Sequence, residues 1–259
     1  MPDTIKVDEL RKRLDSGEPT TVLDVRPSME RAEWSIPGSL HIDAYDALKA
    51  GDPEALAGFE APAGIPVVTV CGAGKTSLIA AEQLRARGVA ARSLVGGMKT
   101  WSLAWNSAEV PVPRSDASVI QIRRTGKGCL SYLVGSNGEA TVIDPSVDPG
   151  GYLDLARQRG WTITQILETH VHADHLMRSR LLAERACAVL LLPDTDRVRY
   201  TAEPLRDGDL LRVGSSELRV IATPGHTLES LSFLLDGEAL FTGDTLFLAG
   251  VGRPDLEAG

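Results

Sequence analysis

Short apolar runs alternate with amphipathic segments along the first hundred residues. Residues 7–14 carry apolar side chains at helical spacing, and residues 21–25 form a compact apolar run typical of a strand. A β-branched run, Val67–Val70, leads through a glycine-rich turn into Leu78–Arg87, which we expect to be helical. This alternation continues as far as Trp105 and predicts an α/β unit built on a mostly parallel sheet.

A proline-containing stretch divides the chain. Residues 109–116 include Pro111 and Pro113, which disfavour a continuous helix or a central strand, and a second alternating pattern begins after them. We therefore expect a first domain over residues 1–108, a linker over 109–116 and a second domain over 117–259. A chain of 259 residues fits one or two domains, and its 43% hydrophobic content allows each to bury a core.

Composition and charge exclude several classes of partner. The net charge of −8 and the pI near 5.2, without a basic stripe, argue against nucleic acid. No apolar run has the length of a membrane helix, and the N-terminus lacks the pattern of a secretion signal, so we expect no membrane partner. The three cysteines, Cys71, Cys129 and Cys187, form no paired framework, which favours a reducing cytoplasm. The last two lie in apolar segments, where we expect buried structural roles.

A cluster of histidines indicates metal chemistry. His170, His172, Asp174 and His175 lie within six consecutive positions, just after the β-rich run Ile163–Leu167. Imidazole nitrogen and carboxylate oxygen suit Fe(II) and Zn(II). The spacing therefore predicts a metal site in preference to a group of surface or capping histidines.

Two further candidate ligands follow later strands. His226 stands in a Thr-Pro-Gly-His-Thr segment after Leu218–Ala222, and Asp244 follows a glycine after Ala239–Phe241. A glycine before each ligand would let the backbone turn sharply, so that the strand ends could converge on one site. Taken alone, His226 would be an ordinary surface histidine, and the distant cluster is what favours a ligand. His41 has no other candidate ligand near it in the sequence and is most simply a polar residue near a strand start.

The glycine-rich turn of the first domain carries a candidate nucleophile. Cys71 opens this turn, where backbone amides and a helix N-terminus would favour a negatively charged thiolate. A nucleotide-binding P-loop would need glycine at position 69, which is Thr69, so the likeness of Gly74-Lys75-Thr76 to that motif fails on spacing. A buried structural cysteine remains the second interpretation.

The turn resembles the Cys-x-x-Gly-x-x-Ser loop of the rhodaneses, which are sulfurtransferases. Further segments typical of that family follow one another in order: Leu23–Arg26, Ser35–Ser39 and Val95–Trp101. The resemblance implies that Cys71 carries sulfane sulfur as a persulfide. It also implies that the loop amides cradle this group, namely those of Gly72, Ala73, Gly74, Lys75, Thr76 and Ser77. Many rhodaneses have arginines in this loop, whereas this chain has Gly72 and Thr76, which argues against thiosulfate as the donor.

Residues 117–259 resemble the metallo-β-lactamase superfamily. The likeness is closest to its persulfide dioxygenase branch, of the ethylmalonic encephalopathy protein type, a neighbour of the glyoxalase II thioesterases. It rests on the segments Gly128–Val134, Val142–Pro145, Glu168–His175, Thr223–Thr227, Thr242–Thr245 and Val251–Asp255. The resemblance implies one Fe(II) per chain, held by His170, His226 and Asp244. The remaining residues of the cluster would orient ligands and substrate or belong to a second metal site: His172, Asp174 and His175.

Together the two resemblances imply a fusion protein of sulfur metabolism. Iron would oxidise a low-molecular-weight persulfide, such as glutathione persulfide, with dioxygen to sulfite and thiol, while Cys71 moves sulfane sulfur to or from the same pool. One alternative is a glyoxalase II-like thioester hydrolase that uses Zn(II) with Asp174 and His175 in a fuller site. Another is a sulfur carrier with an inactive metal site. The oligomeric state stays open, with a homo-oligomer among the expectations.

The resemblances also imply a fold class. We expect an α/β rhodanese-like domain followed by an αββα metallo-β-lactamase sandwich. Relatives continue well beyond the segment Gly252–Asp255, whereas this chain ends at Gly259. We therefore expect an incomplete sandwich, truncated at the C-terminus, with exposed apolar surface and unpaired strand edges.

Overall fold

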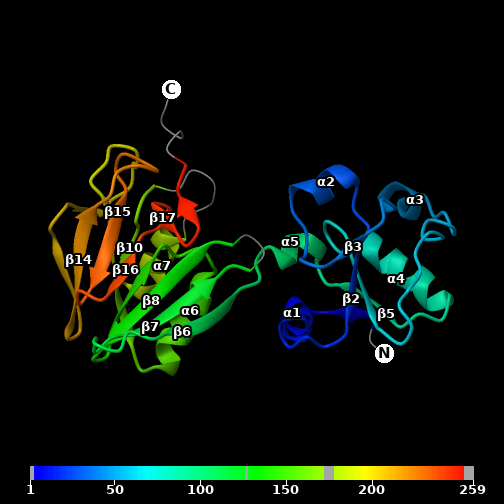
Figure 1. Cartoon of the computed structure of the whole chain (residues 1–259), viewed down its shortest axis with the longest axis horizontal. Helices are drawn as coiled ribbons and strands as arrows, with labels where there is room; N and C mark the ends of the chain where they lie inside the picture. The colour runs from blue at the N-terminus through cyan, green and yellow to red at the C-terminus, as the bar shows by residue number, and fades with distance from the viewer. Residues whose placement is uncertain (1–2, 126–127, 172–177, 254–259) are drawn as a thin grey trace. The chain divides into compact units, whose positions relative to one another are not determined.

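The chain divides into two compact units. A computed structural model describes residues 3–125, 128–171 and 178–253. The first unit comprises Met1–Ala104 with Thr125–Lys127, and the second comprises Trp105–Arg124 with Gly128–Gly259 (Figure 1). Within the described ranges, no helix combines the length and the apolar composition that crossing a membrane requires.

The division differs from the predicted linker. Strand β6, Asn106–Val110, pairs with β7, Ser118–Arg123, and so belongs to the second unit. The long N-terminal stretch of the first unit accordingly ends at Ala104, whereas the predicted first domain ran to residue 108. Pro111 and Pro113 lie just beyond β6, where they interrupt no ladder. β6 is mostly polar and lies at the edge of its sheet, so the pattern of hydrophobic residues did not predict a strand there.

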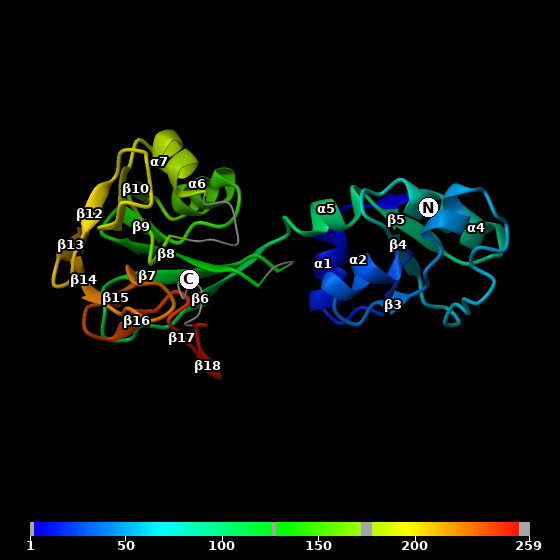
Figure 2. The ribbon, with the colours of Figure 1, turned by 90° about the horizontal axis from the view of Figure 1, so that it is seen from above.

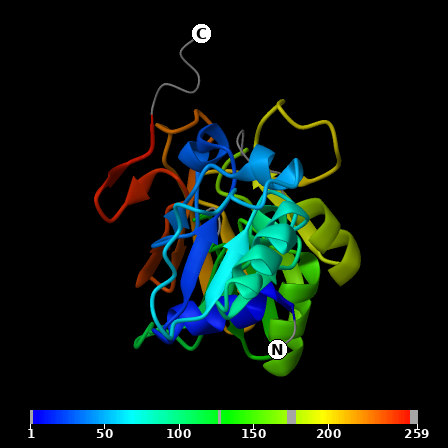
Figure 3. The same ribbon diagram turned by 90° about the vertical axis from the view of Figure 1, so that its right-hand side faces the viewer.

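The first unit is built on five parallel strands in the order β1-β5-β4-β2-β3 (Figures 1 and 3). The strands are β1 Thr4–Ile5, β2 Thr21–Asp24, β3 Leu40–His41, β4 Val67–Val70 and β5 Ala91–Leu94. The helices are α1 Val7–Asp15, α2 Ser28–Glu33, α3 Tyr45–Lys49, α4 Thr76–Ala86 and α5 Gly97–Trp101. The predicted helices near residues 7–14 and 78–87 and the predicted strands at 21–25 and 67–70 are confirmed to within two residues.

Both faces of this sheet are buried. Side chains of a strand point alternately to its two faces. Val68 and Val70 of β4 pack in a cluster with residues of α1 and α5, whereas Val67 and Cys71 pack in a cluster with residues of α3 and α4. The continuous apolar run in the sequence is thus the mark of a central parallel strand covered on both sides. Cys71 lies at the carboxyl end of that strand, where open α/β sheets place their functional groups.

The second unit contains two larger sheets and a hairpin. The seven-stranded sheet has the order β12-β11-β10-β9-β8-β7-β6, and the four-stranded sheet has the order β13-β14-β15-β16. Beyond β6 and β7, the first contains β8 Leu130–Ser136, β9 Glu139–Ile143, β10 Thr162–Leu167, β11 Val189–Pro193 and β12 Glu203–Leu205. The second contains β13 Leu210–Val213, β14 Ser216–Ala222, β15 Leu231–Leu235 and β16 Ala239–Phe241, and β17 Leu246–Phe247 pairs with β18 Gly250–Val251. The helices are α6 Pro149–Gln158 and α7 Ser179–Ala186.

These elements form a layered sandwich (Figure 2). Leu167 of β10 packs in a cluster shared with the four-stranded sheet, which includes Phe233, whereas the preceding Ile166 packs in a cluster shared with α6 and α7, which includes Tyr152. Alternation along each strand therefore supplies one core between the two sheets and another between the larger sheet and its helices. The predicted succession of an α/β unit on a parallel sheet and a layered sandwich is confirmed.

Two smaller predictions can be checked against the side chains. Cys187 is exposed, so the prediction that it is buried was wrong. It ends α7 in the left-handed region, with φ of 52°, at the turn that leads to β11. Cys129 is partly buried. His41 lies in β3 as a polar strand residue, and its Nε2 is 2.8 Å from the carbonyl oxygen of Arg26.

Candidate functional site

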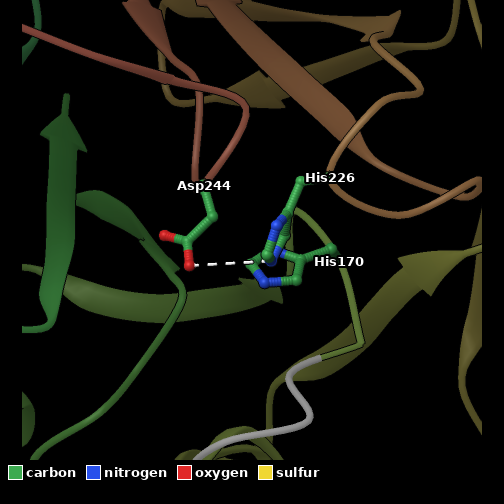
Figure 4. Close-up of side chains that lie close together, drawn as sticks. All are labelled: His170, His226 and Asp244. Carbon is green, nitrogen blue, oxygen red and sulfur yellow. Dashed lines mark ion pairs between the residues drawn. The ribbon is translucent and has the colours of Figure 1, made fainter. Parts of the chain in front are cut away.

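Three side chains from two different sheets meet in the second unit. His170 follows β10 of the seven-stranded sheet, while His226 follows β14 and Asp244 follows β16 of the four-stranded sheet. One potential ligand atom from each residue lies within 4.8 Å of the other two. Figure 4 shows the three side chains directed toward one another from separate loops. The structure thus brings together the residues that the sequence suggested as metal ligands.

The donor set fits a divalent metal ion. Two atoms that each coordinate one metal at about 2.0–2.2 Å can be at most about 4.4 Å apart. His226 Nε2 and Asp244 Oδ2, 3.8 Å apart, lie inside this limit. The three donors together lie within 4.8 Å, so closing around one metal needs shifts of only a few tenths of an ångström. Two imidazoles and one carboxylate are also the ligands that suit Fe(II) and Zn(II).

A buried relay orients the imidazole of His170. Asp144 accepts hydrogen bonds from the backbone N–H of Thr169 at 2.7 Å and from its hydroxyl at 2.9 Å. Because that hydroxyl proton points to the carboxylate, its oxygen accepts from Nδ1–H of His170, 2.9 Å away. In this arrangement Nδ1 carries the proton, so Nε2 is the nitrogen of His170 that could coordinate a metal. All three side chains are at least 95% buried.

Backbone groups hold the other two ligands. His226 Nδ1 is 3.1 Å from the carbonyl oxygen of Arg253, which accepts the Nδ1 proton and leaves Nε2 directed toward Asp244. Gly243 has φ of +49°, and a Cβ there would lie 2.2 Å from the Thr169 hydroxyl. A Cβ on Gly252 would lie 1.8 Å from the carbonyl oxygen of Asp244. Only glycine fits at these two positions, so the ligand loops pack against each other through bare backbone.

The three candidate ligands differ in exposure. His170 is 2% exposed and the His226 side chain 10%, whereas the Asp244 side chain is 44% exposed. The carboxylate is therefore the most accessible of the three donors. The other members of the histidine cluster, His172, Asp174 and His175, lie outside the described residues.

One further side chain joins the ligand loops. Glu229, three positions after His226, accepts a hydrogen bond from the backbone N–H of Val171 at 3.3 Å and forms an ion pair with Arg197 at 2.9 Å. Its side chain is 7% exposed. This carboxylate therefore ties the loop after β14 to the residue after His170 and to the loop after β11.

The second predicted site lies in the first unit. Cys71 is 1% exposed, and its Sγ accepts hydrogen bonds from the backbone amides of Gly74 at 3.2 Å and Ser77 at 3.3 Å. Two of the six loop residues predicted to cradle a persulfide thus donate to the sulfur. The other four are Gly72, Ala73, Lys75 and Thr76, of which Ala73 and Lys75 are exposed.

Segments distant in sequence complete this loop. Met98 N–H donates to the Cys71 carbonyl oxygen at 2.8 Å, and Lys99 N–H donates to the Gly72 carbonyl oxygen at 3.0 Å. A Cβ on Gly97 would lie 2.1 Å from the Cys71 carbonyl oxygen, and one on Gly74 would lie 2.7 Å from the Gly96 nitrogen. The start of α5 therefore fixes the shape of the turn.

Sequence reasoning missed the polar residues behind both sites. Asp144 and Thr169 occur in quoted segments, but nothing in their spacing indicates that a carboxylate 25 positions away would orient the residue before His170. The available signal was only that Asp144 follows one strand and Thr169 lies just beyond the end of the next. Ser93, which lies beneath Ser77 in the first unit, gave no signal.

Comparison with known proteins agrees with the two-part organisation. Residues 124–259 match the family model of the metallo-beta-lactamase superfamily, and residues 6–104 match that of the rhodanese-like domain. A hydroxyacylglutathione hydrolase of Rhodospirillum rubrum is 41% identical over 128 residues, which cover 47% of this chain and 49% of that protein. The chain spans about half the length of the curated relatives it matches.

Solved structures resemble the second unit. A metallo-beta-lactamase from Staphylococcus aureus subsp. aureus COL is 35% identical with a TM-score of 0.51, covering 55% of this chain and 46% of that chain. ETHE1 from Myxococcus xanthus is 33% identical with a TM-score of 0.47, covering 60% of this chain and 64% of that chain. At that lower score, the likeness carries no argument about function.

Proposed function

This chain belongs to the metallo-beta-lactamase superfamily, and a rhodanese-like domain precedes the superfamily domain in the sequence. We propose that the chain oxidises a low-molecular-weight persulfide. One observation carries the proposal. The chain holds two separate groups suited to sulfane sulfur. One is a set of two imidazoles and one carboxylate. The other is a buried cysteine whose sulfur accepts hydrogen bonds from backbone amides of its loop. Chemistry on a common persulfide would explain both.

His170, His226 and Asp244 would hold one Fe(II). Iron in a site of two histidines and one carboxylate supplies a redox-active centre with open positions for substrate and dioxygen. The protein's part is to present the three donors. The Thr169 hydroxyl and the Arg253 carbonyl keep the Nδ1 proton of each histidine in place, so that both Nε2 atoms remain donors. The exposed side of Asp244 gives the substrate its approach.

The overall reaction is balanced with dioxygen as the oxidant. A persulfide RSSH, one dioxygen and one water give the thiol RSH, sulfite and two protons. The S–S bond breaks, and the outer sulfur is oxidised while dioxygen is reduced. Glutathione is the thiol we favour, since the matched relatives are hydroxyacylglutathione hydrolases, whose substrates contain that thiol.

Cys71 would exchange sulfur with the same pool. Its thiolate attacks the outer sulfur of a donor persulfide, a new S–S bond forms on Cys71, and the donor leaves as its thiolate. The amides of Gly74 and Ser77 stabilise negative charge at the sulfur before the attack. Transfer in the opposite direction uses the same step in reverse.

Oxygen uptake with glutathione persulfide tests this function. We expect the iron-loaded wild-type chain to consume oxygen and release sulfite. Asp244→Ala should abolish the activity, while Asp154→Ala, which removes an exposed carboxylate of the same unit, should leave it unchanged. Cys71→Ser should retain oxygen uptake but lose persulfide loading at position 71. Oxygen uptake that survives Asp244→Ala would overturn the iron assignment.

Zinc-dependent thioester hydrolysis is the second candidate. It is favoured by the relatives named hydroxyacylglutathione hydrolase, among which the protein of Rhodospirillum rubrum is 41% identical. Metal ions with open positions can activate water for attack on a carbonyl. Hydrolysis of lactoylglutathione by the zinc-loaded chain in the absence of oxygen would establish this activity in place of persulfide oxidation.

A further inference from the structure

Three buried side chains form a hydrogen-bonded line beneath the Cys71 loop. Cys71 Sγ lies 3.3 Å from the hydroxyl oxygen of Ser77, which lies 2.8 Å from the hydroxyl oxygen of Ser93. The three residues are 1%, 0% and 1% exposed. Ser77 belongs to the first turn of α4, and Ser93 belongs to β5. Ser93 therefore reaches the sulfur only through the Ser77 hydroxyl.

The hydrogen bonds along this line can run in two directions. A serine hydroxyl has one proton to donate, so Ser77 donates either to the sulfur or to Ser93. When Cys71 is a thiol, its S–H donates to Ser77, and Ser77 donates to Ser93. When Cys71 is a thiolate, the sulfur can only accept. Ser77 must then donate to the sulfur, and the Ser93 hydroxyl can rotate to donate to Ser77.

We propose that Ser93 is a positioning residue for Cys71, holding the Ser77 hydroxyl in the orientation that donates to the thiolate. The inference rests on the proposed function of Cys71 as the sulfur-carrying nucleophile. Hydrogen bonds that end on a charge are stronger than neutral ones, and successive bonds polarise one another. The line is therefore strengthened more in the thiolate arrangement than in the thiol arrangement. The thiol proton itself leaves to solvent, and both serines keep theirs.

The proposed effect is separable from charged groups near the loop. Lys75 is an exposed loop residue, Lys99 is exposed at the start of α5, and a Cβ on Gly72 would lie 3.8 Å from Glu30 Oε2. All three side chains are exposed, whereas the hydrogen-bonded line is buried. A substitution at Ser93 changes none of them and adds no charge.

Alkylation of Cys71 by iodoacetamide measures its thiolate directly. The extent at each cysteine is read by mass spectrometry, which separates Cys71 from Cys129 and Cys187. At pH 7, Ser93→Ala should slow alkylation of Cys71 about threefold, since a hydrogen bond that favours the charged form is weakened. Ser93→Thr, which keeps the hydroxyl, should restore the wild-type rate.

Thr69→Val is the matched control for loosening of the structure. The Thr69 hydroxyl is also fully buried, but it donates to the backbone carbonyl of Ser77 at 2.7 Å and not to its hydroxyl. We expect this variant to alkylate like wild type. An equal slowing in Thr69→Val and Ser93→Ala would overturn the proposal, as would an unchanged rate in Ser93→Ala.

A double variant tests whether Ser93 acts through Ser77, and Ser93→Thr keeps the test decisive if Ser93→Ala folds poorly. In the Ser77→Ala background the line is already broken, so adding Ser93→Ala should slow alkylation no further. An additional slowing would contradict the proposal. Persulfide loading from glutathione persulfide is measured separately on the wild type. Failure to load sulfur, with the alkylation pattern intact, would refute the sulfur-transfer function of Cys71 and leave the positioning role of Ser93 standing.

Discussion

At the scale of residues, the candidate metal ligands depend on neighbours that are not candidates themselves. The hydroxyl of Thr169 is shared between Asp144 and His170, and it sets which nitrogen of His170 carries the proton. Of the three candidates, His170 could be predicted from the close spacing of its cluster, whereas His226 and Asp244 gained weight only from that cluster and from the family resemblance. Thr169 and Asp144 could not, because their contact joins residues 25 positions apart and depends on how β9 and β10 pair.

Removing the hydroxyl of Thr169 should weaken metal binding. Thr169→Val keeps the shape of the side chain but leaves Nδ1 of His170 without its acceptor and Asp144 with one donor fewer. Loss of such a supporting group typically lowers metal affinity about 10- to 100-fold. It should also lower the free energy of unfolding by roughly 1–3 kcal/mol, because buried polar atoms lose their partners.

Titration of the metal-free chain with Zn(II) or Co(II) gives this affinity. Thr169→Ser, which keeps the hydroxyl, serves as the control and should bind within a fewfold of wild type. Equal affinities for Thr169→Val and Thr169→Ser would show that the hydroxyl does not orient His170.

At the scale of elements, close backbone contacts build both candidate sites. The strand–turn–helix around Cys71 could be predicted, because an apolar run, a glycine-rich turn and a helical segment follow one another locally. The docking of α5 on that turn could not, since it depends on Gly97, a distant residue that approaches the Cys71 carbonyl oxygen. Strand β6 could not be predicted either, because it is an edge strand with mostly polar residues and lacks a hydrophobic pattern.

Gly97→Ala should destabilise the first unit more than an ordinary glycine substitution. Gly97 has φ of +55° and would place a Cβ 2.1 Å from the Cys71 carbonyl oxygen, whereas Gly88 has φ of +81° with nothing within 4 Å. Gly88→Ala should therefore cost about 1 kcal/mol from backbone strain alone. Gly97→Ala should cost more than about 3 kcal/mol, because backbone must also shift. Thermal and urea unfolding measure the stability of the two variants. Similar losses of unfolding free energy would contradict the close approach of Gly97 to the Cys71 carbonyl oxygen.

Tyr152 of α6 gives the second unit a distinctive pH dependence. Burial raises the pKa of its phenol, although its oxygen is held by Ser131 and by the amides of Ser146 and Val147. As pH rises above the unfolded value of about 10, the unfolded phenol ionises while the folded one stays neutral. The unfolded state then binds fewer protons, so this contribution to stability is complete below about pH 10 and is lost above it, by about 1.4 kcal/mol per pH unit.

Tyr152→Phe removes that titration. The variant should be less stable at pH 8, because the backbone amides of the loop after β9 lose their acceptor. Its difference from wild type in unfolding free energy should narrow between pH 10 and 11. Urea unfolding at pH 8, 10 and 11 measures the difference, and a constant gap over this range would contradict the assignment.

At the scale of the whole molecule, two units with separate cores each carry one candidate site. Every residue of the two core clusters of the first unit precedes Trp105, and every residue of the other two clusters follows Ala104. Both families could be anticipated from short motifs, because those motifs sit at strand ends that fix the fold locally. The boundary between the units could not, because it depends on the pairing of β6 with β7.

The metal content of the purified chain tests the central claim most directly. The chain is expressed with iron and zinc both available, and the metals are counted by mass spectrometry. We expect close to one iron per chain in the wild type and in Asp154→Ala, and almost none in Asp244→Ala. Two zinc ions per chain, or a stoichiometric metal that Asp244→Ala retains, would contradict the assignment of one iron to His170, His226 and Asp244.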